Sequence, residues 1–377
     1  MKVCDLDRDW LETPFALQGF TVRSAADIAE VARYCQHVYV EAPQTGASTP
    51  ARDAFIFVPA GGQKALDACA KTYDEARSIT RTMMDDVRLG RAIDIKAVKA
   101  TVSNCVRAIL DNPEAMQWIT RMRERDDYTS EHSLNVAMLA ISFGHSLGAG
   151  EEDLVRMGLA GILHDVGKMR VPMEILNKPG KLDDQEFAEM KHHSRYGRDV
   201  LLTLRNIGPA VDVAHSHHEM LDGSGYPRGV NAESISHVTR IISLCDVYDA
   251  ITNDRCYKTA QPALEALRII YNERGRQFDE VLAEQFIRHI GIYPPGSIVQ
   301  LHSGEVGIVI STNARDRHLP KVLLVRDSLK QPMTERVINL EQAAKRHDDM
   351  QLIAEAKPNG AYGIRIEEYV KRGLNIF

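Results

Sequence analysis

Histidine and aspartate residues gather in one part of the chain, between residues 132 and 246. The chain has 14 histidines, and several stand alone or in pairs near the ends of expected helices. Imidazole and carboxylate groups are the ligands that borderline and hard divalent cations prefer. Helical bundles build two-metal sites from such side chains, and each helix contributes one or two inward-pointing ligands. The candidate ligands are His132, His164, Asp165, His192, His193, His217, His218 and Asp246.

A metal site has to be weighed against an ordinary helical core. A single buried histidine is more often a core residue than a ligand, and a lone His-Asp pair occurs by chance in many chains. The coincidence of several such features favours the metal site. His164-Asp165 ends one expected helix and precedes Val166-Gly167-Lys168, and two more histidine pairs and a later aspartate follow in the same helical region. Asp165 can bridge two metal ions through its two oxygens.

The residues that must position these ligands, from 63 to 290, are expected to be all α-helical. Leu134, Met138 and Ile141 recur near helical spacing, and Asn112-Pro113 is a helix start signal. Met138, Leu139, Ile141, Phe143, Leu154, Met157 and Leu163 are expected in the core. The expected helices cover 65–89, 93–110, a helix from 112, 130–147, 151–164, 183–203, 207–218, 238–253, 262–271 and 279–289.

The flanking regions have a different character. Residues 1–62 suggest strands at 17–22 and 37–40, a helix at 25–34, and a linker rich in Pro, Gly, Ser and Thr. Residues 291–340 suggest a small, barrel-like β module with strands at 297–301, 306–311 and 321–325. The tail, 341–377, is compatible with a helix over 352–356. The predicted fold class is mainly α, with a small α/β N-terminal domain and a small C-terminal β module.

Composition excludes several classes of protein. The 46 Lys and Arg residues against 52 Asp and Glu residues give a net charge of −6, which argues against binding a nucleic-acid polymer. No apolar run approaches the roughly 20 residues of a membrane helix. The N-terminus turns acidic at Asp5, unlike a secretory signal. The 6 cysteines form no CxxC pair, as expected of reduced thiols in the cytoplasm.

The motifs carry a resemblance to a known family. His164-Asp165-Val166-Gly167-Lys168 resembles the HDxGK signature of HD-domain phosphohydrolases, and 217–227 resembles the HHExxDGxGYP signature of the HD-GYP subfamily. Residues 128–133, 246–250 and 255–258 resemble its opening and closing segments, so the resemblance covers about 126–290. Residues 6–15 also resemble a small domain of unknown function that often precedes HD-GYP domains.

The resemblance implies an HD-type helical bundle at 126–290. Residues 63–125 are interpreted as a helical connector, with a dimerisation helix pair at 63–110 as the alternative, and 1–62 as a small domain and linker with a candidate regulatory role. It implies a bacterial phosphodiesterase that opens cyclic di-GMP to linear pGpG, and often continues to GMP, through a metal-bridging water or hydroxide. Two alternatives stay open. One is an inactive cyclic di-GMP receptor of the same fold, and the other is a phosphodiesterase for another cyclic dinucleotide. A homodimer or a signalling-protein partner is compatible with the sequence.

The resemblance also assigns ligands. One metal takes His132, His164, Asp165 and Asp246, and the other shares Asp165 and takes His193, His217 and His218. The family places one ligand four residues before a glycine, so Gly197 selects His193 over His192. A glutamate that recruits a third metal in some members is replaced here by Tyr128, which makes a third metal doubtful, although Glu131 is near. Iron or manganese is expected, and nickel or zinc would also bind such ligands.

The remaining site residues surround these ligands. Lys168 is expected to pair with the scissile phosphate, and Asp249, one turn after Asp246, to orient a ligand or move a proton. Arg255 and Lys258 match family positions that hold the phosphates of the ligand. Gly223, Gly225 and Pro227 are expected to shape a loop near the site, within the motif at 217–227. Tyr226 either stacks on guanine or packs under that loop.

Overall fold

The computed structural model describes residues 2–6, 20–22, 24–35, 38–40, 62–122, 128–253, 260–313 and 316–371. Contacts divide the chain into two compact units. One unit comprises 58–290 with 365–377, and the other comprises 1–57 with 291–364. The helical unit holds every candidate metal ligand, so it is described first.

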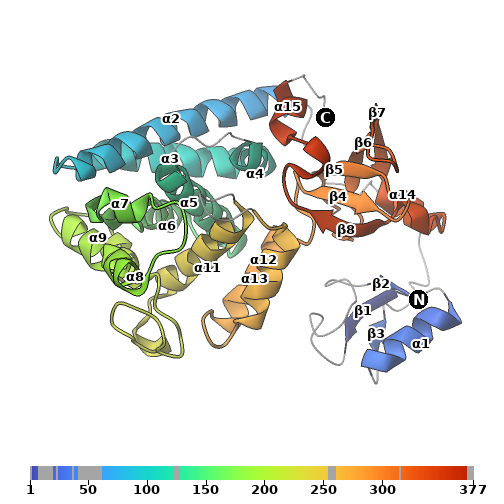
Figure 1. Cartoon of the computed structure of the whole chain (residues 1–377), viewed down its shortest axis with the longest axis horizontal. Coiled ribbons are helices and arrows are strands. Elements are labelled where there is room, and N and C mark those ends of the chain that lie inside the picture. The colour runs from blue at the N-terminus through green and yellow to red at the C-terminus, as the bar shows by residue number, and fades with distance from the viewer. Residues whose placement is uncertain are drawn as a thin grey trace. The chain divides into compact units, whose positions relative to one another are not determined.

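The helical unit follows the apolar periodicity of the sequence closely (Figure 1). Its longer helices begin and end within a few residues of the expected positions. They are α2 (Gly62–Arg88), α3 (Ile95–Asp111), α4 (Pro113–Met122), α5 (Tyr128–Ser146), α6 (Glu151–Leu163), α8 (Asp184–Lys191), α9 (His193–Leu201), α10 (Ala210–Ser216), α11 (His237–Thr252), α12 (Ala263–Asn272) and α13 (Glu280–Ile290). A 3-10 turn, η2 (Val166–Arg170), and the short α7 (Met173–Leu176) follow α6.

One expected helix, 183–203, is divided at His192 into α8 and α9. The Asp183 carboxylate caps the start of α8, and Glu186 completes the capping box. At the break, the His193 ring hydrogen-bonds through Nδ1 to the carbonyl oxygen of Met190, at 2.7 Å. A side chain that donates a hydrogen bond to a backbone carbonyl competes with the backbone N–H group that would bond there in a continuous helix. A new helix, α9, therefore starts here, with His193 turned inward.

The helices expected to form a connector pack into the bundle itself. Helix α2 lies against α3, α4, α5 and η2, and α3 lies against α6. Tyr73 of α2 donates a hydrogen bond to Asn135 of α5 at 2.9 Å, and Arg77 pairs with the buried Glu131 at 2.6 Å. The helix that follows the N-terminal region therefore contacts the same helix that carries His132.

The core of the helical unit is built from large buried side chains of its helices. Trp118, Phe143 and Phe286 are almost fully buried, and the rings of Phe143 and Phe286 meet edge to face with centroids 5.1 Å apart. The expected core residues Met138, Ile141, Phe143, Leu154, Met157 and Leu163 are buried, and Leu139 is half-buried. Aromatic pairs in this geometry add to the hydrophobic contribution of their burial.

The N-terminal part forms a small antiparallel sheet of order β2-β1-β3, with one helix, α1 (Ala25–Tyr34). Its strands are β1 (Lys2–Leu6), β2 (Phe20–Thr21) and β3 (Val38–Val40). Two strands and the helix were expected, and β1 is additional. Ser24 caps α1 in a reciprocal pair with Asp27, which satisfies backbone N–H groups at the start of the helix.

The C-terminal module is a five-stranded antiparallel sheet of order β7-β6-β5-β4-β8. The expected strands are β4 (Ile298–Leu301), β5 (Val306–Ser311) and β6 (Lys321–Arg326), and β7 (Pro332–Asn339) and β8 (Ile353–Lys357) are additional. The helix considered for 352–356 is therefore wrong, because this segment pairs with β4. With β7 and β8 at its edges, the described sheet is open rather than barrel-like. Helices α14 (Leu340–Lys345) and α15 (Ile366–Lys371) follow β7 and β8, and α15 packs on α4.

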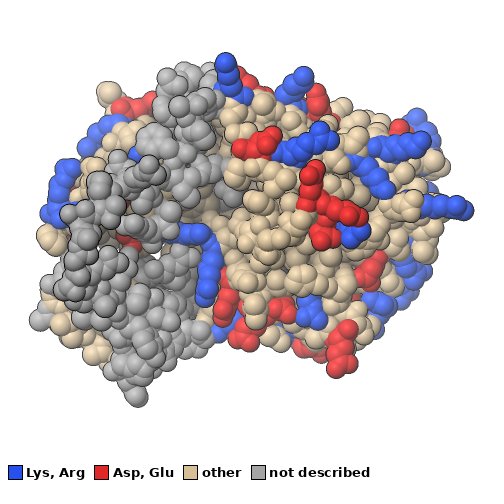
Figure 2. Space-filling model, turned by 180° about the vertical axis from the view of Figure 1, so that it is seen from behind, with Lys and Arg blue, Asp and Glu red and all other residues tan. Residues whose placement is uncertain are grey.

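Charge on the face shown in Figure 2 is mixed in sign. Among the described residues of that face, Lys and Arg alternate with Asp and Glu, and neither sign forms a continuous field. Of the described helices, none combines the length and the apolar composition needed to cross a bilayer.

Close approach of α5 and α6 depends on a glycine. A Cβ atom added to Gly161 of α6 would lie 2.6 Å from the Cα and 2.8 Å from the backbone N of Ala137 in α5. Backbone atoms cannot move aside as a flexible side chain can. Since α5 carries His132 and α6 ends at His164, the spacing of these helices also sets the spacing of the two histidines.

Gly161→Ala is expected to destabilise the fold by about 2–3 kcal/mol, because it overpacks a helix interface. Denaturant unfolding followed by circular dichroism measures this change. Gly150→Ala is the matched control, since a Cβ at Gly150 meets no atom within 4 Å, and it should cost no more than about 1 kcal/mol as a changed helix cap. Equal losses in the two variants would contradict the close-packing argument.

Candidate metal centre

Five segments of the helical unit converge on one buried cluster of imidazoles and carboxylates. His132 lies on α5, His164 and Asp165 join α6 to η2, and His193 begins α9. His217 and His218 follow α10, and Asp246 lies on α11. All of these side chains are buried except His218, which is half-buried. All the candidate ligands chosen from the sequence except His192 are therefore brought to one place.

The cluster consists of two groups. Within each group, the possible ligand atoms all lie within 4.8 Å of one another. The first group is His132, His164 and Asp246. His132 Nε2 lies 3.0 Å from Asp246 Oδ1, and His164 Nε2 lies 4.0 Å from the same oxygen. Two ring nitrogens and one carboxylate oxygen thus face a common point.

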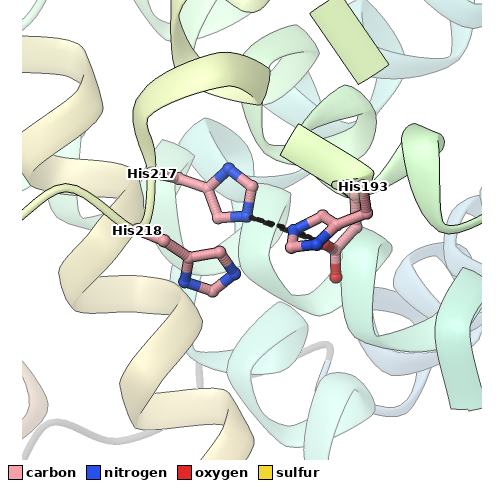
Figure 3. Close-up of side chains that lie close together, drawn as sticks. His193, His217 and His218 are labelled. Carbon is pink, nitrogen blue, oxygen red and sulfur yellow. Dashed lines mark hydrogen bonds and ion pairs between the residues drawn. The ribbon is translucent and has the colours of Figure 1, made fainter. Parts of the chain in front are cut away.

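The second group is Asp165, His193, His217 and His218. His193 and His217 point toward each other, with their Nε2 atoms 3.3 Å apart, and His218 lies beside His217 (Figure 3). The ring centroids of His217 and His218 are 4.1 Å apart. Three imidazoles thus converge from two elements.

Asp165 belongs to the second group and also faces the first, with one oxygen toward the imidazoles of each. Its Oδ2 lies 3.3 Å from His164 Nε2 and 3.7 Å from His132 Nε2. Its Oδ1 lies 3.5 Å from His193 Nε2 and 3.6 Å from His217 Nε2. This division of the two oxygens is the arrangement of a carboxylate that bridges two cations.

Hydrogen bonds on the far side of each ring set which nitrogen faces the cluster. The Nδ1 atoms of His164, His193 and His217 lie 2.7, 2.7 and 3.0 Å from the carbonyl oxygens of Gly161, Met190 and Val213. A carbonyl accepts only, so Nδ1 carries the proton and Nε2 keeps a lone pair for the cluster. His132 does the same with Asp249, whose Oδ2 lies 2.7 Å from its Nδ1.

Burial and neighbouring charge set the protonation states. Burial lowers the pKa of His193 to about 3 and lowers the pKa of His218 well below its usual value. Burial opposes ionisation of Asp165, but Lys168 and His164 hold the pKa of this carboxyl well below its usual range. Burial would also lower the pKa of His132, but hydrogen bonds to Asp246 and Asp249 raise it to about 9. The negative charge of Asp246 and Asp249 would also attract a metal cation, which would compete with the second proton on the His132 ring.

The residues present fit divalent metal ions. Two buried atoms at the centre, His164 Nε2 and Asp165 Oδ1, have no hydrogen-bond partner. A buried polar atom without a partner is costly, and a cation would satisfy both atoms. The ligand set mixes imidazole nitrogens with carboxylate oxygens, as divalent transition metals prefer.

Lys168 and Asp249 adjoin the ligands directly. Lys168 Nζ lies 2.5 Å from Asp165 Oδ2, so in this structure its ammonium contacts the central carboxylate. Asp249 contacts His132 and accepts a hydrogen bond from Asn253 Nδ2, which makes it an orienting partner of that histidine. Of the two roles expected for Asp249, its contacts support ligand orientation.

The loop after His218 is held by Glu219, which our sequence reasoning did not single out. The buried carboxylate of Glu219 accepts hydrogen bonds from the backbone N–H groups of Arg228, at 2.7 Å, and Val230, at 3.1 Å. A Cβ at Gly225 would lie 2.5 Å or less from backbone atoms of Glu219 and Met220, so only glycine fits there. The position of Glu219 within the HHE motif was the available signal.

This loop places Tyr226 over the second group. The Tyr226 ring stacks on His218, with centroids 4.7 Å apart and 29° between the ring planes. Burial raises the pKa of Tyr226, so its hydroxyl stays protonated at neutral pH. The ring thus borders the cluster, and contact with a ligand stays a prediction.

A second glycine contact brings the two halves of the cluster together. A Cβ at Gly167 would lie 2.0 Å from the carbonyl oxygen of His193 and 2.3 Å from the backbone N of Gly197. The turn that bears Asp165 therefore packs backbone to backbone against the helix that bears His193. This contact gives a physical reason for a glycine at position 167.

Other expected residues lie outside the cluster. His192 is on the surface beside Glu189, with 46% of its side chain exposed. Tyr128 opens α5, and Glu131 is buried and paired with Arg77. Arg255 and Lys258 lie outside the described residues.

His193→Ala is expected to lower bound metal by about one ion per chain, because it removes an inward nitrogen from the second group. Elemental analysis of protein purified from metal-supplemented medium measures this. His192→Ala is the matched control and should keep the full metal content, since its ring faces solvent. The reverse order would show that the wrong histidine of the pair was chosen.

Comparison with known proteins places this site in a family. The model of the HD domain matches residues 106–282, and that of a domain of unknown function, DUF3391, matches residues 1–98. These matches agree with the resemblances inferred from residues 164–168 and 6–15.

One of the similar curated proteins matches most of the chain, and two others match less than half of it. A cyclic di-GMP phosphodiesterase of Pseudomonas aeruginosa is 35% identical over 362 residues, which is 92% of this chain and 87% of the relative. The cyclic di-GMP phosphodiesterase response regulator RpfG of Xanthomonas campestris is 38% identical over 44% of each chain. The 3'3'-cGAMP-specific phosphodiesterase 3 of Vibrio cholerae is 40% identical over 39% of this chain and 32% of the relative. The chain therefore belongs to the HD-domain family of cyclic di-GMP phosphodiesterases.

Proposed function

We propose that the protein hydrolyses cyclic di-GMP to linear pGpG, and then to GMP, with the help of two divalent metal ions. The observation that carries this proposal is the position of Asp165, whose two oxygens face two separate groups of imidazoles. The first metal would be held by His132, His164, Asp165 and Asp246, and the second by Asp165, His193, His217 and His218. The names of the relatives supply the substrate.

The surrounding residues then have separate tasks. Two bound divalent ions would neutralise the phosphodiester oxygens and acidify the attacking water. Lys168, held against Asp165, would move its ammonium to the scissile phosphate as substrate enters. Asp249 would hold the His132 ring so that Nε2 points to the cluster. Tyr226 would border the substrate through the ring that covers His218.

The metal is proposed to be iron or manganese. Imidazole and carboxylate ligands without a thiolate suit these ions, and nickel or zinc would also bind. No third ion is proposed, because the buried Glu131 is paired with Arg77. Arg255 and Lys258 are proposed to hold the phosphate remote from the metals, since a second phosphate would otherwise lose hydration without compensation.

A mixed cyclic dinucleotide is the second candidate substrate, since one relative is named a 3'3'-cGAMP-specific phosphodiesterase. Incubation of metal-replete protein with cyclic di-GMP and with 3'3'-cGAMP, followed by separation of the products, tests both. Faster turnover of 3'3'-cGAMP would overturn the assignment of the substrate. Binding of cyclic di-GMP without turnover would favour the inactive receptor instead.

The cytoplasm is the proposed location. Cys35, Cys69, Cys105 and Cys245 are buried free thiols, which suit a reducing compartment. We further infer that residues 1–62 carry a regulatory role, through a homodimer contact or a signalling partner. Size-exclusion chromatography with light scattering addresses the first of these.

Asp165→Asn is expected to lower kcat by at least about 1,000-fold, because an amide has one carbonyl oxygen and no charge with which to bridge two cations. Product formation from cyclic di-GMP measures this. The far-ultraviolet circular dichroism spectrum should match that of the parent protein, which separates a lost site from a lost fold. Near-normal turnover would sink the bridging role.

Removal of metal with EDTA is expected to reduce hydrolysis by at least about 100-fold, because the imidazole and carboxylate cluster has no other strong electrophile. Protein purified before chelation should hold about two transition-metal ions per chain by elemental analysis. Activity should return with added Mn²⁺ or, without oxygen, Fe²⁺. Full activity in EDTA with no more than a trace of metal would refute the proposal.

A further inference from the structure

Lys191, the last residue of α8, connects two segments that are distant in the sequence. Its Nζ lies 4.6 Å from the ring centroid of Phe187, one turn earlier on α8. The same Nζ lies 5.3 Å from the ring centroid of Tyr226, in the loop after His218. The contact with Phe187 is an ordinary neighbour contact within a helix. The contact with Tyr226 is not local, and it brings a cation to the border of the metal centre.

The path from Lys191 to the ligands is short. The Tyr226 ring contacts both the Lys191 ammonium, at 5.3 Å from its centroid, and the ring of His218, on which it stacks at 4.7 Å. His218 belongs to the second group of candidate ligands. A molecule bound at the metals and extending past Tyr226 would therefore meet Lys191 next.

The charge of Lys191 has no carboxylate partner among the described residues. The neighbouring acids are already engaged, because Glu186 pairs with Lys178, and Glu189 contacts Tyr196 and His192. An ammonium ion held by two aromatic faces, and half removed from water, keeps the capacity to bind an anion.

Phe187 adds an apolar face to the same place. It is 47% exposed, although large aromatic side chains are usually buried. An exposed aromatic ring beside a cation is the combination that nucleotides bind, since the base stacks on the ring and the phosphate pairs with the charge.

We propose that Phe187 and Lys191 of α8 form, with Tyr226, a subsite for the nucleotide remote from the scissile phosphate. In this subsite the purine stacks on Phe187, and Lys191 adds its positive charge to those already proposed for the second phosphate. The subsite rests on the proposed function, because it needs a substrate with two nucleotides. It would let the enzyme distinguish a cyclic dinucleotide from a simple phosphodiester.

Steady-state kinetics of Lys191→Ala test the subsite. We expect the KM for cyclic di-GMP to rise about tenfold, since a charge-assisted contact is lost, with kcat within about twofold of the parent. Phe187→Ala should raise the same KM about fivefold or more through lost stacking. The loss should be much smaller with bis(p-nitrophenyl) phosphate, which has neither a second phosphate nor a purine. Lys191→Arg, which keeps the charge, should recover most of the affinity.

Matched controls separate recognition from general effects. Lys181→Ala removes an exposed positive charge just before α8, and Leu202→Ala removes an exposed apolar side chain after α9. Both should leave the KM unchanged. Equal loss on both substrates, or loss of metal, in Lys191→Ala would mean that Lys191 only holds the loop and would overturn the subsite. If the parent protein failed to hydrolyse cyclic di-GMP, the proposed function would fail instead.

Discussion

The carboxylate of Asp165 lies where two groups of imidazoles meet, and the helical unit is arranged to hold it there. Each oxygen faces histidines from different elements, at 3.3–3.7 Å. A buried carboxylate is stable as an anion only when positive charge compensates it. Lys168 provides one such charge. The two buried atoms without a hydrogen-bond partner, His164 Nε2 and Asp165 Oδ1, indicate where metal cations would provide more.

The orientation of the candidate ligands at this centre is set by contacts with the backbone. Three histidine rings are oriented by carbonyl oxygens within four residues of their own positions, and a fourth by Asp249. Gly161 and Gly167 let α5, α6, η2 and α9 approach until their backbones touch. Rings held from behind on closely packed elements lose little entropy when a metal binds.

The residues proposed for substrate recognition lie beside this centre, on a loop and at the end of a short helix. Glu219 holds the loop that carries Tyr226, and α8 ends beside that loop. Elsewhere in the helical unit, α2 contacts α5 through Tyr73 and Arg77. These two contacts tie α2 to the helix that carries His132.

Much of this protein could be predicted from its sequence, because much of it depends on local patterns. Apolar periodicity located the long helices, and the motifs at 164–168 and 217–227 indicated the family and four of the candidate ligands, since spacing within one helix or turn is a local property. What depended on contacts between distant segments could not be predicted. The sequence did not reveal that strand β8 pairs with β4, that Glu219 anchors a loop, or that Lys191 reaches Tyr226. Asp165 was chosen as a bridging ligand from a motif, but only the tertiary structure decided which of its two oxygens faces which histidine. The backbone contact between Gly167 and Gly197 brings together the segments that carry Asp165 and His193, and no local pattern in the sequence relates these two segments.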